Sequence, residues 1–381
     1  MIFATPPLAD DEAKVAAEIA ELRQKLRFAT RQVRRWTGVL RRGAFALAIQ
    51  GSNSIEGYNV TFEDAVAAIQ DEEPLEADKE AWEATKGYRD AMTYALQLSE
   101  ERGFQVSVDL IKSLHFMMLK YDLAKHPGRW RPGHIYVRNE PTGDIVYEGP
   151  DVDLVPGLMS ELVESVNAQN DHPVMVRAAM AHLNLVMIHP FSDGNGRMAR
   201  ALQTLVLARE GIVEPEFCSI EEYLSRARQD YYRVLADVGQ GKWHPERDAR
   251  NWVRFCLQAH YRQARRLLDR TREYARVWGE LELLAKKLSL VERTILAMFD
   301  AALGWKVRNA TYRKAAEISE NLASRDLKVL CDAKLLIPQG ERRGRFYIAA
   351  PQIREIGTRK TESHAAPEPP EVQQLMLPGV A

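Results

Sequence analysis

A short polar loop between two apolar stretches constrains the fold more than any other segment. Residues 189–200 read His-Pro-Phe-Ser-Asp-Gly-Asn-Gly-Arg-Met-Ala-Arg. Apolar residues recur at helical spacing before the loop, over 174–188, and again behind it, from Met198 onwards. Pro190 and the two glycines interrupt the helical pattern. The sequence therefore predicts two helices joined by a tight loop, with polar side chains gathered at the start of the second helix.

The polar residues of this loop suit the binding of a polyphosphate. Backbone N–H groups at a helix N-terminus form an anion site, which a ligand can approach closely at Gly194 and Gly196. Arg197 and Arg200 are spaced to lie on nearly one helix face, and a guanidinium fork matches phosphate oxygens. Asp193 adds an oxygen ligand of the kind that Mg²⁺ prefers.

His189, at the start of the loop, is the one nearby side chain that exchanges a proton near neutral pH. A base, a metal ligand and an anion site within one loop indicate transfer of a group from a nucleoside triphosphate. A lone His-Pro or Gly-x-Gly is usually only a turn, so this interpretation depends on the whole string.

The string at 189–200 resembles the Fic-family motif, H-P-F-x-[D/E]-G-N-G-R-x-x-R, at every specified position. The resemblance extends over roughly residues 45–260. It implies a mainly α-helical Fic-type domain with a β-hairpin flap, and transfer of AMP from ATP to a hydroxyl side chain of a protein. A branch of the family that phosphorylates its target has lysine at the position of Gly196, so the glycine favours AMP transfer. Transfer of UMP or phosphocholine stays open.

The resemblance also implies a role for each residue of the loop. His189 resembles the base that deprotonates the target hydroxyl, Asp193 the Mg²⁺ ligand, and Phe191 an apolar anchor that holds the loop on the core. The residues expected to bind ATP and its phosphates are Gly194, Asn195, Gly196, Arg197, Arg200, Tyr231 and Tyr232. The two tyrosines fall where the family has a helix near the adenine, and core packing explains them equally well.

A second motif lies well upstream of the loop. Residues 52–57 read Ser-Asn-Ser-Ile-Glu-Gly, which resembles the inhibitory motif of the family, [S/T]-x-x-x-E-[G/N]. The resemblance implies that Ser52, Glu56 and Gly57 form a built-in brake. A Glu56 carboxylate paired with Arg200 would occupy the guanidinium meant for the terminal phosphate and would repel ATP.

Residues 134–147 hold two short β-branched and aromatic runs around a Pro-Thr-Gly-Asp turn, a pattern that predicts a β-hairpin. A hairpin in a helical domain has an exposed edge that can receive another strand. The resemblance implies that this flap holds the segment of the target protein to be modified.

The chain has a second, smaller unit after residue 285. Three predicted helices, at 290–301, 311–318 and 321–333, precede a small hairpin that ends near residue 350, which is the outline of a winged helix-turn-helix. Residues 306–345 contain ten basic and five acidic residues. Arg342, Arg343 and Arg345 would lie on the wing, where phosphate contacts are common, while Asp326 and Asp332 reduce the charge of the third helix. DNA binding and protein docking or dimerisation are equally compatible with this pattern.

The predicted domains are therefore a Fic domain with an N-terminal inhibitory region at 1–277 (core about 108–258), a winged helix at 285–350 and a disordered tail at 351–381, which is rich in Pro and Glu. Apolar periodicity predicts the helices of the first domain over 11–50, 78–101, 107–122, 152–168, 174–188, 197–210, 220–238 and 246–277.

Length and composition agree with this organisation. A chain of 381 residues is expected to form two or three domains, and its net charge of -1 excludes a globally basic nucleic-acid coat. The three cysteines are too few and too widely spaced for a disulfide framework. The first residues lack the pattern of a secretion signal, and no apolar run has the length of a membrane span, so we expect a cytoplasmic protein.

The main hypothesis is a self-inhibited protein adenylyltransferase that uses ATP and Mg²⁺ and docks its target protein at hairpin 134–147. One alternative is a DNA-binding regulator whose Fic domain senses nucleotide, and another is removal of AMP from a modified protein by the same site. Homo-oligomer formation stays open.

Overall fold

The computed structural model describes the chain except residues 32–33, 139–142, 212, 342–343, 360–369 and 376–381. It is mainly α-helical, as predicted. The larger part contains α1 (Asp10–Arg31), α2 (Thr37–Ile55), α3 (Phe62–Ile69), α4 (Lys79–Ser99), α5 (Val108–Leu119), η1 (Leu123–Lys125), η2 (Val152–Leu154), α6 (Val155–Asn167), α7 (Val174–Ile188), α8 (Asn195–Ala208), η3 (Pro215–Phe217), α9 (Glu221–Arg226), α10 (Arg228–Gly239) and α11 (Arg250–Lys287). The smaller part contains η4 (Glu292–Thr294), α12 (Ile295–Ala302), α13 (Asn309–Ala315), α14 (Glu320–Asp332), β4 (Leu336–Gln339), β5 (Phe346–Ala349) and α15 (Pro351–Thr358).

Helix α7 lies at the centre of the larger part, and nearly all of its side chains are buried. Its sequence is apolar around the whole circumference, which is the pattern of a helix surrounded by protein. It packs against α6, α8 and α11. Trp252 of α11 is fully buried there, and its indole N–H donates a hydrogen bond to the Ala179 carbonyl (2.7 Å). The loop at 189–194 is thus held between two core helices, α7 and α8.

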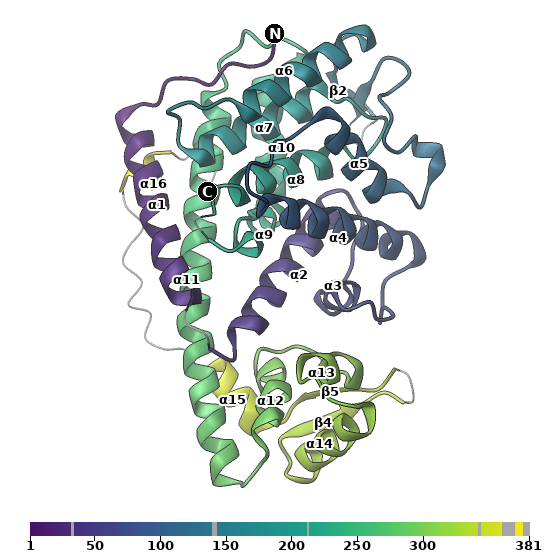
Figure 1. Ribbon diagram of the computed structural model, residues 1–381, viewed down its shortest axis with the longest axis vertical. Helices are drawn as coiled ribbons and strands as arrows, with labels where there is room; N and C mark the ends of the chain where they lie inside the picture. Colours follow the sequence, from purple (N-terminus) through teal and green to yellow (C-terminus); the bar gives the residue numbers. More distant parts are fainter. Residues whose placement is uncertain (32–33, 139–142, 212, 342–343, 360–369, 376–381) are drawn as a thin grey trace.

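The N-terminal helix predicted over 11–50 is two helices. The chain turns at residues 34–36, where the buried Trp36 ring packs edge-on against Tyr274 of α11, and α2 then leaves at a new angle beside α11 (Figure 1). The free energy gained by burying this indole outweighs the preference for one continuous helix that the apolar pattern indicates. Helix α3, which the apolar pattern did not indicate, begins with a Thr61–Asp64 capping box.

The predicted hairpin is confirmed. Strands β1 (Tyr136–Arg138) and β2 (Ile145–Glu148) pair in antiparallel fashion, and the intervening residues 139–142 lie outside the described part of the chain. A third strand that the sequence did not indicate, β3 (Gly241–Lys242), pairs in parallel with β2. Within the described residues, β2 is therefore paired on both sides, and the outer edge of the flap is that of β1.

The smaller part is the lower body in Figure 1. Its helices α12, α13 and α14 precede the antiparallel pair β4–β5, the order on which the winged-helix prediction rests. An isolated bridge between Val307 and Tyr347 adds to this pair. Asp326 does not face outward on α14 as expected, because it is buried and bonded to Arg293 and Tyr312. Of the predicted wing residues, Arg345 is exposed, and 342–343 lie outside the described part.

The prediction of a disordered tail from residue 351 is wrong for two segments. Pro351–Thr358 forms α15, whose Ile353 and Ile356 are buried against the smaller part, and α16 (Pro370–Gln374) lies against α1 (Figure 1). The overall composition of the tail conceals these short apolar pairs, which become buried only because another surface is available to cover them.

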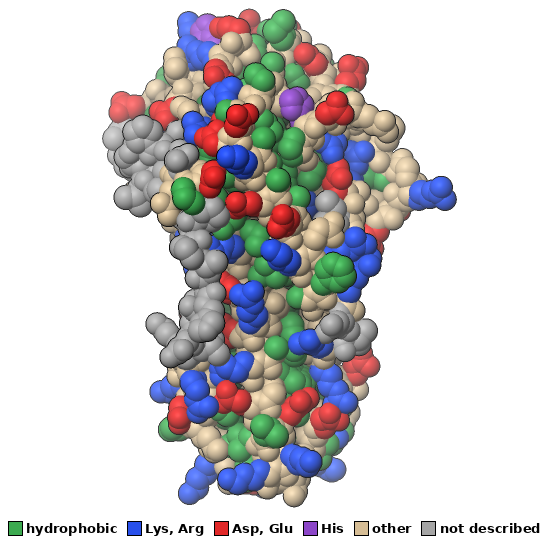
Figure 2. All heavy atoms as spheres, turned by 90° about the vertical axis from the view of Figure 1, so that its left-hand side faces the viewer, with side chains coloured by type: hydrophobic (Ala, Val, Ile, Leu, Met, Phe, Trp, Pro, Cys, Tyr) green, Lys and Arg blue, Asp and Glu red, His purple; other side chains and the backbone are tan. Residues whose placement is uncertain are grey.

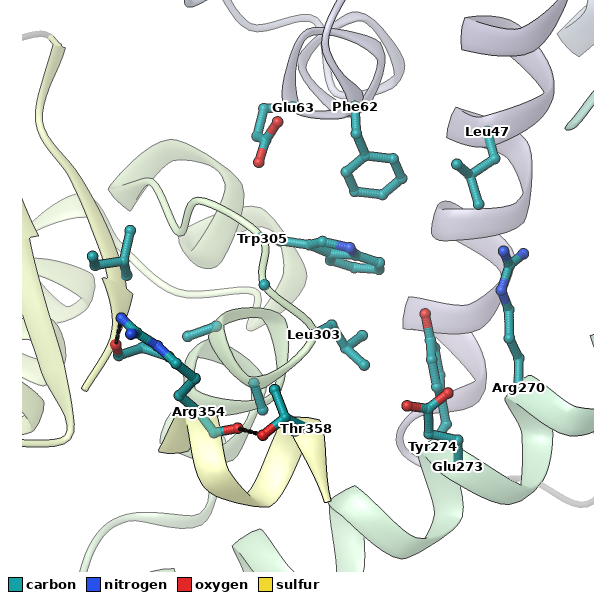
Figure 3. A pocket seen from close by; sticks show the side chains of 16 residues that line it. Leu47, Phe62, Glu63, Arg270, Glu273, Tyr274, Leu303, Trp305, Arg354 and Thr358 are labelled. Atoms are coloured by element: carbon teal, nitrogen blue, oxygen red, sulfur yellow. Dashed lines mark hydrogen bonds between the residues drawn. The ribbon is translucent and has the colours of Figure 1, made fainter. Parts of the chain in front are cut away.

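The two parts meet along α11, which continues to Lys287, ten residues beyond its predicted end at 277. A cavity of about 710 Å³ lies at this junction. Figure 3 shows the Trp305 ring next to Phe62 of α3, with Tyr274 and Arg270 of α11 across the cavity from Arg354 of α15. None of the predicted site residues lines it.

Basic and acidic side chains are interspersed on the face that carries α1 (Figure 2), as the near-zero net charge implies. Among the described residues, no helix has both the length and the apolar content that crossing a bilayer requires.

Candidate functional site

Two residues in the left-handed backbone region define the ends of the loop between α7 and α8. His189 (φ 51°) caps α7, and its N–H donates to the Leu185 carbonyl (3.0 Å). Gly194 (φ 76°) is the residue before α8, and a side chain there is disfavoured by this φ. The first turn of α8 thereby presents its backbone N–H groups to the loop, as predicted for an anion site.

Phe191 and Asn195 hold the loop together from inside. The Phe191 ring is fully buried and stacks on His115 of α5, with ring centroids 3.6 Å apart. The Asn195 side chain bonds both the N–H and the C=O of Phe191 (2.9 Å each). The Asn195 amide is therefore used within the loop, and only its backbone N–H remains for a phosphate.

His115 is a further support that the sequence analysis missed. Gly128 N–H donates to its Nδ1 (2.9 Å), so Nε2 carries the proton and donates to the Asp193 carbonyl (2.8 Å). Burial lowers the pKa of His115 to about 4, which keeps this ring neutral. Its partners lie 13 and 78 positions away, so no local pattern marks it.

His189 is placed to accept a proton. Its Nδ1 lies 3.1 Å from the Val186 carbonyl and therefore carries the proton, which leaves the lone pair of Nε2 free. Burial lowers the pKa of His189, outweighing that backbone hydrogen bond. The imidazole is neutral at physiological pH, as a general base must be.

Arg131, a second residue that the sequence analysis missed, connects this loop to the flap. Its Nε donates to the His189 carbonyl (3.0 Å), and its N–H donates to the Pro190 carbonyl (2.9 Å). Its guanidinium also bonds the carbonyls of Gly133 and Pro150, on either side of the hairpin. Arg131 fixes the position of the flap relative to His189.

Arg197 and Arg200 of α8 are both buried but differ in their partners. The three guanidinium nitrogens of Arg197 have no hydrogen-bond partner among the described residues. Arg200 donates through Nε to Ser52 Oγ (2.9 Å), and through one terminal nitrogen to the Ser52 carbonyl (3.0 Å) and to Glu56 Oε1 (2.7 Å). The pairing of Glu56 with Arg200 that the sequence predicted is present.

Two glycines make this pairing possible. Gly57 (φ 86°) ends α2 in a turn that brings Tyr58 N–H to the Asn53 carbonyl (3.0 Å), a Schellman-type cap that orients Glu56. A Cβ on Gly196 would lie 2.3 Å from Glu56 Oε1. Gly196 therefore leaves the space that the carboxylate occupies.

Asp193 is the one carboxylate of the loop. Its Oδ1 accepts from Gly194 N–H (2.6 Å), and its Oδ2 lies 3.0 Å from Nζ of Lys125. Burial would raise the pKa of Asp193, but the Lys125 ammonium lowers it below its usual value. Within the described ranges no group of three or more His, Cys, Asp or Glu is arranged to hold a metal ion. One carboxylate is nevertheless the usual protein share of a Mg²⁺ bound with nucleotide phosphates, so Asp193 fits such an ion.

The two predicted tyrosines occupy different positions. Tyr231 is 1% exposed and its hydroxyl bonds His182 of α7 (3.0 Å), so this side chain is part of the core of the larger part. Its burial against Trp252 explains the departure from the prediction. The side chain of Tyr232 is 43% exposed, and its hydroxyl donates to the Ile55 carbonyl (3.0 Å) at the end of α2.

Comparison with known proteins places this geometry in a family. The model of the Fic/DOC family matches residues 105–207. The protein adenylyltransferase Fic of Nematostella vectensis is 28% identical over 227 residues, which are 56% of this chain and 47% of that protein. The protein adenylyltransferase fic-1 of Caenorhabditis elegans is 32% identical over 153 residues, 39% of this chain and 27% of that protein. The chain thus spans less than half the length of these curated relatives.

Solved structures show the same fold at low sequence identity. The match with a Fic family protein from Desulfovibrio desulfuricans has a TM-score of 0.58 at 23% identity, and it covers 91% of this chain and 98% of that protein. Fic-1 from C. elegans gives a TM-score of 0.55 at 22% identity over 68% of this chain and 73% of its own. Residues 105–207 thus match the model of the Fic/DOC family, and the fold around them is that of the solved Fic structures.

Proposed function

We propose that this protein is a self-inhibited protein adenylyltransferase, which transfers AMP from ATP to a hydroxyl side chain of a target protein. The observation that carries the proposal is the contrast on one turn of α8. Arg197 is a buried cation that has no hydrogen-bond partner in the described part of the chain, while Arg200 is occupied by Glu56 of the same chain. A buried guanidinium whose three nitrogens are unbonded is costly unless an anion completes it, and a polyphosphate supplies oxygens in the matching geometry.

The reaction that fits the site is an in-line displacement at the α-phosphorus of ATP. The target hydroxyl oxygen forms a bond to that phosphorus, the bond to the oxygen bridging to the β-phosphate breaks, and pyrophosphate leaves. His189 Nε2 takes the hydroxyl proton, and its tautomer is fixed by the Val186 carbonyl. Arg197, Arg200 and the backbone N–H groups of Gly194, Asn195 and Gly196 would orient the phosphates and stabilise their charge. A Mg²⁺ held by Asp193 would neutralise phosphate charge.

The flap is the proposed docking site for the target. The outer edge of β1 is unpaired within the described residues, and Tyr136, Ile145 and Val146 are exposed beside it. An extended target segment added to this edge would form main-chain hydrogen bonds next to His189, because Arg131 ties the flap to that residue.

Two labels in ATP test the reaction. The purified chain and its Glu56→Gly variant are incubated with a lysate and with ATP labelled either at the α- or at the γ-phosphate. AMP transfer places the α-label, and not the γ-label, on protein, and His189→Ala abolishes it while nucleotide binding persists. Transfer of the γ-label would contradict the proposal. Loss of AMP from pre-labelled proteins, without new transfer, would support removal of AMP as the activity.

A second candidate function, duplex DNA binding by the smaller part, is favoured by one observation. Arg325 and Lys328 are exposed on α14, and Asp326 between them is turned inward. In an anisotropy titration of the full chain with random duplexes, we expect Arg325→Ala with Lys328→Ala to weaken binding and to flatten its salt dependence. Absence of binding by the parent at about 50 mM salt would favour a docking role instead.

A further inference from the structure

The inhibitory segment contacts more of the site than the pair of Glu56 and Arg200. The turn at Gly57 folds the chain back, so that Tyr58 lies over the other arginine of α8. The Arg197 guanidinium carbon is 4.9 Å from the centroid of the Tyr58 ring. Arg197 is fully buried, and this ring is the contact that its guanidinium has in place of hydrogen bonds.

Tyr58 also reaches the loop carboxylate through Lys125, which ends η1. The Lys125 ammonium donates to Tyr58 Oη (2.9 Å) and lies 3.0 Å from Asp193 Oδ2. Its other acidic neighbour is Glu80, at 3.7 Å, whose side chain is 65% exposed. Three consecutive residues, 56–58, therefore bear on both arginines and, through Lys125, on Asp193.

Both contacts are of a kind that a nucleotide complex would have to replace. A metal ion and an ammonium group compete for the same carboxylate oxygen, because two cations at contact distance repel each other. A cation–π contact satisfies the charge of Arg197 but none of its five N–H donors, which a phosphate group would satisfy.

We propose that Tyr58 and Lys125 are positioning residues of the nucleotide site: Tyr58 covers Arg197, and Lys125 occupies Asp193 in place of a divalent cation. This inference rests on the proposed nucleotide-binding function. It deepens that function, because the inhibitory segment then acts at both ends of the phosphate site. Removal of Glu56 alone takes away the carboxylate partner of Arg200 but leaves Arg197 covered and Asp193 paired.

The first test separates the tyrosine ring from its hydroxyl. Binding of a fluorescent ATP analogue is titrated in EDTA, in the Glu56→Gly background. Tyr58→Ala should tighten binding about 10-fold, since Arg197 is uncovered, whereas Tyr58→Phe keeps the ring and should stay within about 2-fold of the parent. Tyr94→Ala, at an exposed tyrosine of α4, is the matched control. Unchanged or weaker binding by Tyr58→Ala would overturn the role of the ring.

The second test reads the metal position without measuring transfer. The Mg²⁺ concentration for half-maximal binding of the analogue is determined for Lys125→Met. The control is Lys120→Met, because Lys120 is a lysine that pairs with Asp90 instead of Asp193. Lys125→Met should lower this concentration about 3- to 10-fold and weaken binding in EDTA, because the resident cation is lost. Lys125→Arg should retain the parent requirement. If Lys125 only supported the fold, Lys125→Met would raise the half-maximal Mg²⁺ concentration and also weaken binding in EDTA. That result would overturn the proposal.

Two failures remain distinguishable. If the Glu56→Gly parent binds no ATP analogue with or without Mg²⁺, the proposed function fails and the inference with it. If the parent binds but the Tyr58 and Lys125 variants match their controls, the inference alone fails. Thermal midpoints of all variants are measured in parallel, and Tyr58→Leu replaces Tyr58→Ala if the latter does not fold.

Discussion

Arg197 and Arg200 lie one turn apart on α8, yet their surroundings are opposite. Arg200 donates hydrogen bonds to Ser52 and Glu56, whereas Arg197 contacts the Tyr58 ring and has no acceptor among the residues that the structure describes. The sequence motifs predict the pairing of Arg200 with Glu56 but not the aromatic cover over Arg197, because Tyr58 comes from a segment distant in the sequence, just behind α2. Arg131, His115 and Lys125 were missed for the same reason.

The first residue-scale prediction concerns the base. The pKa of His189 lies below its usual value of 6.5 because burial disfavours the imidazolium. The rate of AMP transfer by Glu56→Gly should therefore be constant from about pH 8 down to about 6.5 and should fall below that, as Nε2 becomes protonated. The pH profile of nucleotide binding by the same variant is the control. A rate that rises on acidification would exclude His189 as the base.

The second residue-scale prediction concerns Glu221, which is buried beneath α2 and accepts from the Tyr88 hydroxyl (2.9 Å). Burial raises its pKa from 4.5 to about 7. Because the folded protein holds this proton more tightly than the unfolded chain, the stabilisation is complete below about pH 4.5 and is lost as the pH rises through about 7. In urea unfolding, the free energy of unfolding of the wild type should fall by about 3 kcal/mol between these pH values because of this group, and Glu221→Gln should remove that part of the fall.

Glu100→Gln, which removes the same charge at an exposed position, is the control for that experiment. A fall in Glu221→Gln equal to that of the wild type would mean that Glu221 does not take up a proton in this range.

At the scale of elements, α2 is set in place by a close helix crossing. A Cβ on Gly51 would lie 2.6 Å from the backbone carbonyl oxygen of Glu221 in α9, so only glycine allows this approach. The next residue, Ser52, bonds Arg200. The close crossing of α2 and α9 therefore fixes the position of α2, and with it the contact of Ser52 with Arg200.

Gly51→Ala should displace α2 from α9, with two measurable effects. We expect a loss of stability of about 1–3 kcal/mol in urea unfolding and a several-fold rise in basal AMP transfer, because the Ser52 and Glu56 contacts are weakened. Gly38→Ala is the matched control on the same helix, since a Cβ there meets nothing within 4 Å. It should be neutral or stabilising by up to about 1 kcal/mol. If Gly51→Ala loses stability but gains no activity, the crossing does not control the brake.

Elements with a strong local signal were predictable: α7 from its long apolar pattern, and the two-strand flap from its turn residues and the β-branched and aromatic runs beside them. The turn at Trp36 was not, because the indole that causes it is buried by Tyr274, a residue distant in sequence. Helix α15 and strand β3 are short, and each becomes stable only by pairing with a surface supplied by the rest of the chain. Such elements carry too little local signal to appear in a periodicity.

At the scale of the whole molecule, the smaller part is fastened to the inhibitory region. Arg42 of α2 donates to both carboxylate oxygens of Asp300 in α12 (2.7 and 2.8 Å), and Phe62 packs against Trp305 (ring centroids 4.6 Å apart). Lys314 pairs with Glu72 after α3 (2.9 Å). Part of the basic charge of residues 306–345 is thus neutralised within the chain.

Arg42→Ala should loosen this junction, because it leaves the Asp300 carboxylate, 10% exposed, without its cation. Loss of one partner of such a buried pair costs about 3 kcal/mol, which should appear as a lower urea midpoint for the smaller part. The double variant Arg42→Met with Asp300→Asn removes both charges and should recover most of the loss. A double variant as unstable as the single one would show that packing, rather than the pair, holds the junction.

The central claim is that Glu56 inhibits AMP transfer by occupying Arg200, and self-modification measured by intact mass tests it most directly. The charge-assisted bond is worth about 1.5–3 kcal/mol, so Glu56→Gly should add AMP to itself about 10- to 100-fold faster than the wild type. Arg200→Ala also breaks the pair but should stay inactive, and the double variant should resemble Arg200→Ala. No gain by Glu56→Gly with saturating ATP and Mg²⁺, or a fully active double variant, would contradict the account.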